Sequence, residues 1–259
     1  MPDATPPSRP AAPFTHMAPF YDALYKAKGK NYRAESDYIH RVIRQHSAQA
    51  HTLLDAACGT GEHLLHLAQR YQTTGLDLSG PMLEVAGAKL PDTPLHTADL
   101  TDAASLRAVG SFDVITCLFA AIAYLPDRGA MDKAVASLAA HLNPNGLLLI
   151  EPGVMPENLS PPVTSTLRVE HDGVAIARTT SAELLYEDNG QQRQPAAIAI
   201  TFDHTLSGVG DPSAVQNFTE RHEVRLFTRT DYEAAFDAAG LIYRFDPQGP
   251  AGLGLFIAN

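Results

Sequence analysis

The 259-residue chain lacks the features that mark several classes of protein. Its two cysteines, Cys58 and Cys117, each lie in an apolar run typical of a strand, which predicts reduced core thiols instead of a disulfide. The chain has neither the paired Cys and His spacing of a zinc site nor the cysteine cluster of an iron–sulfur centre. His63 and His66 share a helix face without a third ligand, so they are expected to be surface residues. We therefore expect no metal.

Basic clusters and long apolar runs are also missing. The formal net charge is −10, and no group of Lys and Arg residues provides the electrostatic footprint of a nucleic-acid-binding protein. No apolar run reaches the roughly 18 residues needed to cross a bilayer. Prolines in Met1–Pro13 stand where a signal peptide would need a hydrophobic segment. We expect a cytoplasmic protein that binds neither nucleic acid nor membrane.

The chain has enough apolar residues, 45% of the total, to bury one large core. Residues 1–13 are rich in Pro and Ala and are predicted to be a disordered tail, with residues 14–259 as a single domain. Two helices, Met17–Ala27 and Tyr32–His46, come first. Strands and helices then alternate, which predicts a parallel sheet covered on both faces. The strands are His51–Ala56, Thr73–Leu78, Pro94–Ala98, Phe112–Leu118 and Gly146–Glu151, and the helices Gly61–Tyr71, Pro81–Lys89 and Arg128–Leu142.

After Glu151 the pattern changes to longer strands separated by turns that contain Gly, Asp and Pro. These strands should pair antiparallel and form an insertion over residues 152–227. They are predicted at Val163–Glu170, Val174–Leu185, Ala196–Leu206 and Thr219–Phe227. A helix, Thr230–Ala239, follows and ends at Gly240, and two closing strands are predicted at Leu241–Phe245 and Leu253–Ala258.

A glycine-rich bend follows the first strand, in the stretch LLDAACGTGEHLLHLA (Leu53–Ala68). Gly59 and Gly61 can take positive φ and let backbone N–H groups approach a ligand. A nucleotide-phosphate loop would continue with Lys and then Ser or Thr, whereas Glu62 follows here, which excludes that class. A dinucleotide loop requires a third glycine where Leu64 stands, which disfavours NAD and FAD.

Asp77, at the end of the next strand in GLDLS, can accept hydrogen bonds from both ribose hydroxyls of an adenosine cofactor. The stretches DAACGTG, GLDLS, ADLTD, FDVITC and LNPNGLLLIEP follow in order between Leu53 and Glu151. Together they resemble the class I S-adenosylmethionine-dependent methyltransferases. This resemblance implies a Rossmann-like α/β fold with a mostly parallel seven-stranded sheet, helices on both faces, and an antiparallel β insertion before the last helix. It also implies S-adenosylmethionine as cofactor.

The resemblance further implies which residues bind the cofactor. Gly59 and Gly61 would line the methionine portion, Asp77 would hold the ribose, and Met82 would pack on the adenine. The cofactor-binding residues that it implies are Tyr21, Tyr32, Ala57, Gly59, Gly61, Asp77, Leu78, Met82, Asp99, Leu100, Cys117, Leu118 and Phe119.

Further stretches extend the resemblance over most of the chain. YDALYKAKGKNY before the first strand, and HEVRLFTRTDYEAAFDAAGL with GPAGLGLF near the end, are similar to the sugar-amine N,N-dimethyltransferases of antibiotic deoxysugar pathways. The resemblance implies that the insertion helps to form a substrate pocket and a homodimer contact. It also places Tyr21 and Tyr32 near the methionyl end of the cofactor.

The chain departs from that family after the fourth strand, where AAIAY replaces a more polar stretch such as SSIGH. This change predicts a less polar acceptor pocket. The substrate-binding residues implied are Phe14, Tyr124, Glu151 and His222. His222 lies in ERHEVRLF on the same strand face as Val224 and matches a family histidine, so His222 and Tyr124 are the catalytic candidates.

The reaction predicted is methyl transfer to an amine of a small molecule, with a sugar-like or other secondary-metabolite acceptor. A sulfonium is a good leaving group, so the protein mainly has to align the acceptor and exclude water. Three alternatives remain open at this stage. They are O- or C-methylation with an enzyme base, a non-catalytic ligand-binding module of the same fold, and an NAD-linked oxidoreductase.

Overall fold

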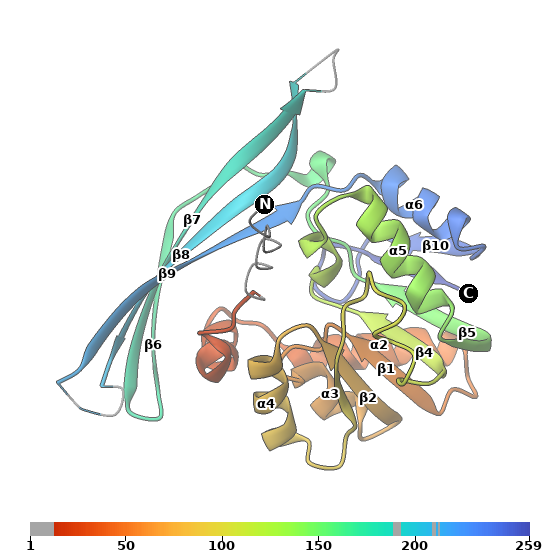
Figure 1. The fold of residues 1–259 in the computed structure, drawn as a ribbon, viewed down its shortest axis with the longest axis horizontal. Helices are drawn as coiled ribbons and strands as arrows, with labels where there is room; N and C mark the ends of the chain where they lie inside the picture. Colours follow the sequence, from red (N-terminus) through yellow and green to blue (C-terminus); the bar gives the residue numbers. More distant parts are fainter. Residues whose placement is uncertain (1–12, 189–192, 209–210, 212) are drawn as a thin grey trace, which may run out of the picture.

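A computed structural model of the chain describes residues 13–188, 193–208, 211 and 213–259. Its strands form a seven-stranded sheet in the order β10-β11-β5-β4-β1-β2-β3 and a four-stranded sheet in the order β6-β7-β8-β9. In Figure 1 the four-stranded sheet extends to one side of the α/β body, and the N-terminal helical segment lies between the two. The predicted tail, residues 1–13, lies outside the described residues except for Pro13.

The seven-stranded sheet is mainly parallel. Its strands are β1 (Thr52–Ala56), β2 (Gln72–Asp77), β3 (Leu95–Thr97), β4 (Phe112–Cys117), β5 (Leu142–Ile150), β10 (Tyr243–Asp246) and β11 (Leu255–Ala258). Strands β1 to β5 pair in parallel, whereas β11 runs antiparallel to both β5 and β10. The central strands are continuous apolar runs because both faces are covered: Leu53 and Leu54 of β1 are buried in two different core clusters.

Helices cover both faces of this sheet. Side chains of α2 (Tyr32–His46), α3 (Glu62–Leu67) and α4 (Gly80–Lys89) pack in one cluster, and those of α5 (Arg128–Ala139) and α6 (Arg229–Ala238) in the other. The sequence supplies the helix starts. Ser79 accepts from the Met82 N–H at α4, and Thr228 and Asp231 form a capping box at α6. In the described part of the chain, no helix combines the length and apolarity that crossing a membrane requires.

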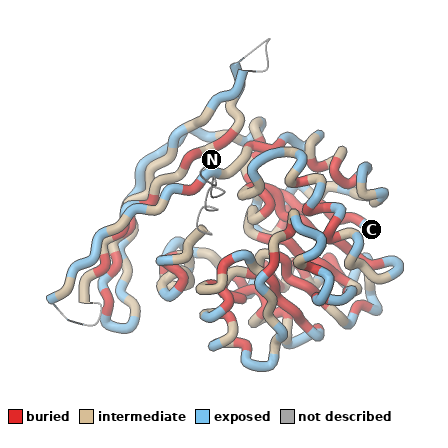
Figure 2. The backbone as a smooth tube through the Cα atoms, in the orientation of Figure 1, coloured by how far each residue is buried: buried red, intermediate tan, exposed pale blue. Residues whose placement is uncertain are grey.

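The second sheet is fully antiparallel and comes between β5 and α6. Its strands are β6 (Ser165–His171), β7 (Val174–Asp188), β8 (Arg193–Ser207) and β9 (Val215–Arg225). Along β8, buried residues alternate with less buried ones, as expected for a strand with one covered face (Figure 2). The covered face packs on the 3₁₀ turn η1 (Ala18–Phe20) and α1 (Tyr21–Ala27), where Met17 and Leu24 meet Ile176 and Leu206.

The predicted fold class is confirmed, and the differences concern element boundaries. The predicted helix Met17–Ala27 is divided into η1 and α1, and α3 is shorter than the predicted Gly61–Tyr71. Strand β5 starts at Leu142, although the sequence NPNG (residues 143–146) is typical of a turn. The chain stays in the sheet because its pairing with β4 shifts register there, with Asn145 in the left-handed region at φ 62°. Asparagine tolerates that conformation better than most residues.

Candidate functional site

The carboxyl ends of β1, β2 and β4 meet at one edge of the seven-stranded sheet. After β1 the chain turns through Ala57, Gly59 and Gly61, which have φ values of 61°, 55° and 77°. A Cβ at Gly61 would lie 2.9 Å from Leu90 Cδ1 and 3.2 Å from Ala86 Cβ, so α4 packs against this glycine. A Cβ at Gly59 would have no described atom within 4 Å, and Gly59 lines an open cavity. The two glycines therefore serve packing and ligand approach respectively.

The Asp77 carboxylate connects this loop to the end of β2. Its Oδ2 accepts the Gly59 N–H at 2.8 Å, and its Oδ1 accepts the Ser79 N–H at 2.8 Å. Burial raises the pKa of Asp77, and the N–H bonds from Ser79 and Gly59 oppose that rise. Because each carboxylate oxygen has a second lone pair, Asp77 keeps acceptor capacity for the hydroxyl groups of a ligand.

A cavity of about 320 Å³ opens beside Asp77, within the range of small-molecule sites. Its wall is mostly apolar, with the carboxylates of Asp77 and Asp99 among the few charged groups. The lining residues are Pro13, Phe14, Tyr21, Ala57, Gly59, Leu76, Asp77, Leu78, Met82, Ala98, Asp99, Leu100, Thr101, Leu118, Phe119, Ala121, Tyr124, Leu125, Pro126 and Ala130.

The end of β4 forms the opposite wall and is conformationally strained. Phe119 and Ala120 are consecutive non-glycine residues in the left-handed region, with φ values of 55° and 58°. The Phe119 N–H donates to Glu151 Oε2 at 2.6 Å, which ties this turn to the end of β5. The other carboxylate oxygen, Oε1 of Glu151, is buried without a hydrogen-bond partner among the described residues. Burial raises the pKa of Glu151, and the hydrogen bond from the Phe119 N–H opposes that rise.

Aromatic rings and a histidine close the cavity on the side of the antiparallel sheet. The Phe14 ring lies 4.3 Å from the His222 ring and 5.1 Å from the Tyr21 ring, measured between centroids. The Tyr124 hydroxyl lies 3.3 Å from His222 Nδ1. Burial lowers the pKa of His222, so the imidazole is neutral at pH 7, and burial raises the pKa of Tyr124. This end of the site is thus an uncharged hydrogen-bonding pair framed by rings.

Helix α1 is held over the glycine loop by charged groups. Asp22 accepts from the Thr60 hydroxyl at 2.5 Å and from the Lys89 ammonium at 2.6 Å. Glu62 pairs with Lys89 at 2.8 Å and with Lys26 at 2.9 Å. These contacts join α1, the loop and α4, and they position the tyrosines of α1 at the cavity.

Most of the residues implied by the resemblance line the cavity. They are Phe14, Tyr21, Ala57, Gly59, Asp77, Leu78, Met82, Asp99, Leu100, Leu118, Phe119 and Tyr124. The others, Tyr32, Gly61, Cys117, Glu151 and His222, are not part of its wall. Two of these five still contact it: Glu151 holds Phe119, and His222 holds Tyr124. Cys117 has a free, fully buried thiol, and its backbone carbonyl accepts the Glu151 N–H.

Two residues beside this site, Tyr25 and Arg178, were not predicted from the sequence. Tyr25 packs against Tyr21 at 4.4 Å and against Phe119 at 5.1 Å, and its spacing of four residues from Tyr21 on a helix is a signal that was available. Arg178 of β7 is fully buried, with its guanidinium over the rings of Tyr25 and Phe202. No local pattern distinguishes Arg178 from other strand arginines.

The expectation that His63 is a surface residue was wrong. His63 is 6% exposed, and its Nε2 lies 2.8 Å from Glu35 Oε2, which also accepts from Lys30 Nζ at 2.6 Å. The predicted helix face points inward at this position because α2 packs across α3 and buries Glu35. His66, one turn further, is half-buried.

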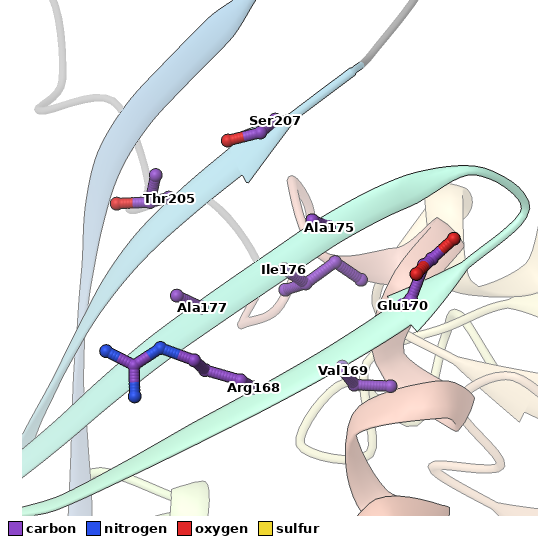
Figure 3. A pocket seen from close by; sticks show the side chains of 8 residues that line it. All are labelled: Arg168, Val169, Glu170, Ala175, Ile176, Ala177, Thr205 and Ser207. Carbon is purple, nitrogen blue, oxygen red and sulfur yellow. The ribbon is translucent and has the colours of Figure 1, made fainter. Parts of the chain in front are cut away.

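A second hollow, of about 410 Å³, lies on the antiparallel sheet (Figure 3). It is lined by Arg168, Val169, Glu170, Ala175, Ile176, Ala177, Thr205 and Ser207. These side chains follow neighbouring strands and do not converge on a common point in Figure 3. Because these side chains do not converge and include no imidazole, the chemistry is assigned to the cavity beside Asp77.

Comparison with known proteins places the fold and this edge of the sheet in one family. A family model described as a methyltransferase domain matches residues 53–146. The dTDP-3-amino-3,6-dideoxy-alpha-D-glucopyranose N,N-dimethyltransferase of Streptomyces fradiae is 37% identical over 93% of this chain and 89% of its own length. The dTDP-3-amino-3,4,6-trideoxy-alpha-D-glucopyranose N,N-dimethyltransferase of Streptomyces venezuelae is 36% identical over 93% and 96%. The chain belongs to the sugar N,N-dimethyltransferase family.

Solved structures agree with that membership. The crystal structure of DesVI from Streptomyces venezuelae superposes with a TM-score of 0.81 at 36% identity, covering 93% of this chain and 97% of that one. An amino pentose methyltransferase from Micromonospora echinaspora, solved with bound S-adenosylmethionine, gives a TM-score of 0.76 at 32% identity over 92% and 95%. The predicted family, enzyme class and cofactor are confirmed: this is an S-adenosylmethionine-dependent methyltransferase.

The residues of the cavity fit that cofactor. Asp77 offers acceptors for a ribose, and Met82 and Leu100 offer apolar surface for a purine. Outside the cavity wall, Glu151 Oε1, behind Phe119, and the Tyr32 hydroxyl are buried without partners among the described residues. Buried polar atoms are almost always hydrogen-bonded, so these two orphan oxygens indicate a polar ligand group beside them.

Proposed function

We propose that this methyltransferase transfers methyl groups to the amine of a nucleotide-linked deoxy-amino sugar. The relatives that match over nearly the whole chain are named for that reaction, and they bear out the predicted transfer to an amine. The observation that carries the proposal is the neutral Tyr124–His222 pair, 3.3 Å apart, beside the cofactor cavity. An uncharged pair of this kind can orient an amine without repelling it by charge.

On the cofactor side, we assign Asp77 to the ribose hydroxyls and Met82, Asp99 and Leu100 to the adenine. Tyr21 and Tyr32 are assigned to the methionyl end, together with the backbone of the loop at Gly59 and Gly61. Ala57, Leu78, Cys117, Leu118 and Phe119 complete the proposed cofactor-binding set. When bound, S-adenosylmethionine supplies a methyl group on a sulfonium leaving group.

On the acceptor side, the protein's contribution is alignment and removal of water. Phe14 and Tyr21 exclude water, while Tyr124 and His222 accept hydrogen bonds from the amine and direct its lone pair along the line of attack. Holding two reactants in an aligned geometry supplies about 7–11 kcal/mol of a reaction barrier. Burial keeps His222 neutral, so it adds no positive charge beside the amine.

Incubation of the purified protein with S-adenosylmethionine and dTDP-linked 3-amino-3,6-dideoxyglucose tests the proposal. The expected products carry one and then two added methyl groups, and fragmentation in the mass spectrometer places both on nitrogen. The same sugar nucleotide with a hydroxyl in place of the amine should give no product. Methylation of that hydroxyl analogue, or of oxygen in the amine, would contradict the assignment to an amine.

We also propose a homodimer that uses the antiparallel sheet of residues 152–227, within a single domain of residues 14–259. The support is that Val163, Tyr186 and Val215, in or beside this sheet, are exposed, although Tyr186 and Val215 lie at opposite ends of the sheet, beside Pro195 and Ser207 of β8. Sedimentation equilibrium should give twice the 27.8 kDa chain mass, and Tyr186→Glu should shift it towards the monomer. The monomer mass for the unchanged chain would contradict the proposal. Location in the cytoplasm stays a prediction.

A further inference from the structure

Arg178 is a buried cation with unused hydrogen-bonding capacity. The residue is 1% exposed, and its Nε and Nη2 atoms have no hydrogen-bond partner among the described residues. The guanidinium instead lies over the rings of Tyr25, at 5.2 Å, and Phe202, at 4.9 Å. Nε and Nη2 form one edge of the planar group, which is the fork that binds two oxygens of a phosphate or carboxylate. Arg178 also hydrogen-bonds the Tyr25 side chain, but leaving the Nε and Nη2 edge of a buried cation without partners is unfavourable, so this free edge indicates an anionic ligand.

A second cation, Lys28, lies beside the same aromatic ring as Arg178. Lys28, just after α1, lies 5.9 Å from the Tyr25 ring that Arg178 also contacts. Partial desolvation of the ammonium, and then the charge of Arg178, lowers the pKa of Lys28, although the residue as a whole is exposed. Within the described ranges neither cation has an ion pair with a carboxylate, and the nearby Glu220 lies 3.5 Å from His204 instead. Two cations without ion pairs among the described residues thus lie near the same Tyr25 ring, in a chain whose net charge is −10.

The Arg178 guanidinium lies close to the end of the cavity that is proposed to bind the acceptor. Phe14 lines the cavity and lies 6.4 Å from Tyr25 and 5.9 Å from Phe202, the two rings that carry Arg178. The rings of Tyr25 and Phe202 therefore separate Arg178 from Phe14 in the cavity wall. Displacement of Phe14 would give a ligand in the cavity access to Arg178. Burial raises the pKa of Tyr124 and lowers that of His222, and the positive charge of Arg178 acts in the lowering direction on both. An anion on Arg178 would thus lie close to the groups that hold the amine.

We propose that Arg178, with Lys28, binds the diphosphate of the nucleotide-linked acceptor and so sets the position of its sugar against Tyr124 and His222. This inference rests on the proposed function, because it assumes an acceptor that carries a diphosphate. The Arg178 fork binds two phosphate oxygens, and Lys28 adds a second positive charge at the exposed edge. Recognition of the diphosphate explains how a mostly apolar cavity can select a charged sugar nucleotide.

Calorimetric titration with thymidine diphosphate tests this directly, on protein saturated with S-adenosylhomocysteine. Arg178→Lys keeps the charge and removes the fork, and should weaken thymidine diphosphate binding about tenfold or more. Lys28→Met, at an exposed position, should weaken thymidine diphosphate binding several-fold. This variant tests the inference if Arg178→Lys does not fold. The matched control is Arg168→Lys, an exposed arginine on the neighbouring strand that pairs with Ala177, and it should leave affinity unchanged. S-adenosylhomocysteine affinity should be equal in all four proteins.

Kinetics separate this inference from the proposed function. With the dTDP-linked amino sugar, Arg178→Lys should raise KM, whereas the same amino sugar without its nucleotide should show equal kcat/KM in both proteins. Unchanged thymidine diphosphate affinity in both Arg178→Lys and Lys28→Met would overturn the inference. A loss of S-adenosylhomocysteine affinity instead would assign Arg178 to the cofactor carboxylate and overturn it too. Arg178-dependent diphosphate binding without methylation of any amino sugar would reject the proposed function and keep this anion site.

Discussion

The hydroxyl of Tyr124 and Nδ1 of His222 lie 3.3 Å apart, although 98 residues separate them in the chain. Tyr124 ends the 3₁₀ turn η2 (Ala121–Tyr124) after β4, and His222 lies on β9 of the antiparallel sheet. The contact therefore joins the two sheets at the acceptor end of the cavity. It makes the two residues one functional unit, which can be tested as such.

Tyr124→Phe and His222→Asn should each lower kcat/KM for the acceptor about tenfold, because each removes one hydrogen bond to the amine or to its partner. The double variant should lose little more than either single variant, since breaking the pair at one end already removes its function. S-adenosylhomocysteine affinity should not change. Losses that multiply in the double variant would show that the two residues act independently.

The pH dependence of kcat/KM should report His222. An amine must be neutral to attack, so activity falls about tenfold per pH unit below the acceptor's own pKa. Burial lowers the pKa of His222 below its usual 6.5, so its protonation adds a second downward limb only below that pH. His222→Asn should keep the first limb and lose the second. An unchanged double slope in the variant would exclude His222 as the group responsible.

Asp77→Asn should weaken S-adenosylhomocysteine binding about tenfold or more, because the charged acceptor for the ribose is lost. The amide also cannot accept from both the Gly59 and the Ser79 N–H, so the loop loses one of its two bonds. Asp102→Asn is the matched control, since Asp102 is an exposed carboxylate that accepts from the Ala104 N–H away from the cavity wall. Equal cofactor affinity in the two variants would contradict the role given to Asp77.

The two loop glycines should differ in what their replacement costs. Gly61→Ala should destabilise the fold by about 2–3 kcal/mol, from positive φ together with the 2.9 Å approach to Leu90. Gly59→Ala has no such clash, so it should cost about 1 kcal/mol of stability and mainly weaken cofactor binding through the methyl group added at the cavity. Urea unfolding and calorimetry on both variants measure the contrast. The reverse order of stability would contradict it.

Asp55 should make stability fall as pH rises. Burial raises its pKa from 3.8 to about 6, despite the Thr116 hydroxyl 2.7 Å away. Between these two values the unfolded chain loses the proton and the folded chain keeps it, so raising the pH favours the unfolded state. Asp55→Asn cannot titrate, and the wild type should lose roughly 3 kcal/mol relative to it between pH 4 and pH 7. A pH-independent difference in unfolding free energy between the two proteins would refute this.

The sequence alone determined the order of the elements, the parallel sheet, the four antiparallel strands and the glycine loop with Asp77. These follow from apolar periodicity, turn residues and motif spacing, which act within one element or between adjacent ones. Strand β5 shows the limit of such signals, because NPNG is typical of a turn and yet stays in the sheet through a register shift.

Only the tertiary structure decided which distant side chains meet. His63 is buried because α2 lays Glu35 against it, and Arg178 is buried because β7 faces α1 across the rings of Tyr25 and Phe202. The contact between Tyr124 and His222 depends in the same way on how the inserted sheet packs on the α/β body. Such neighbours are set by the packing of whole faces, and burial and charge pairing follow from that packing. No local pattern of residues contains this information.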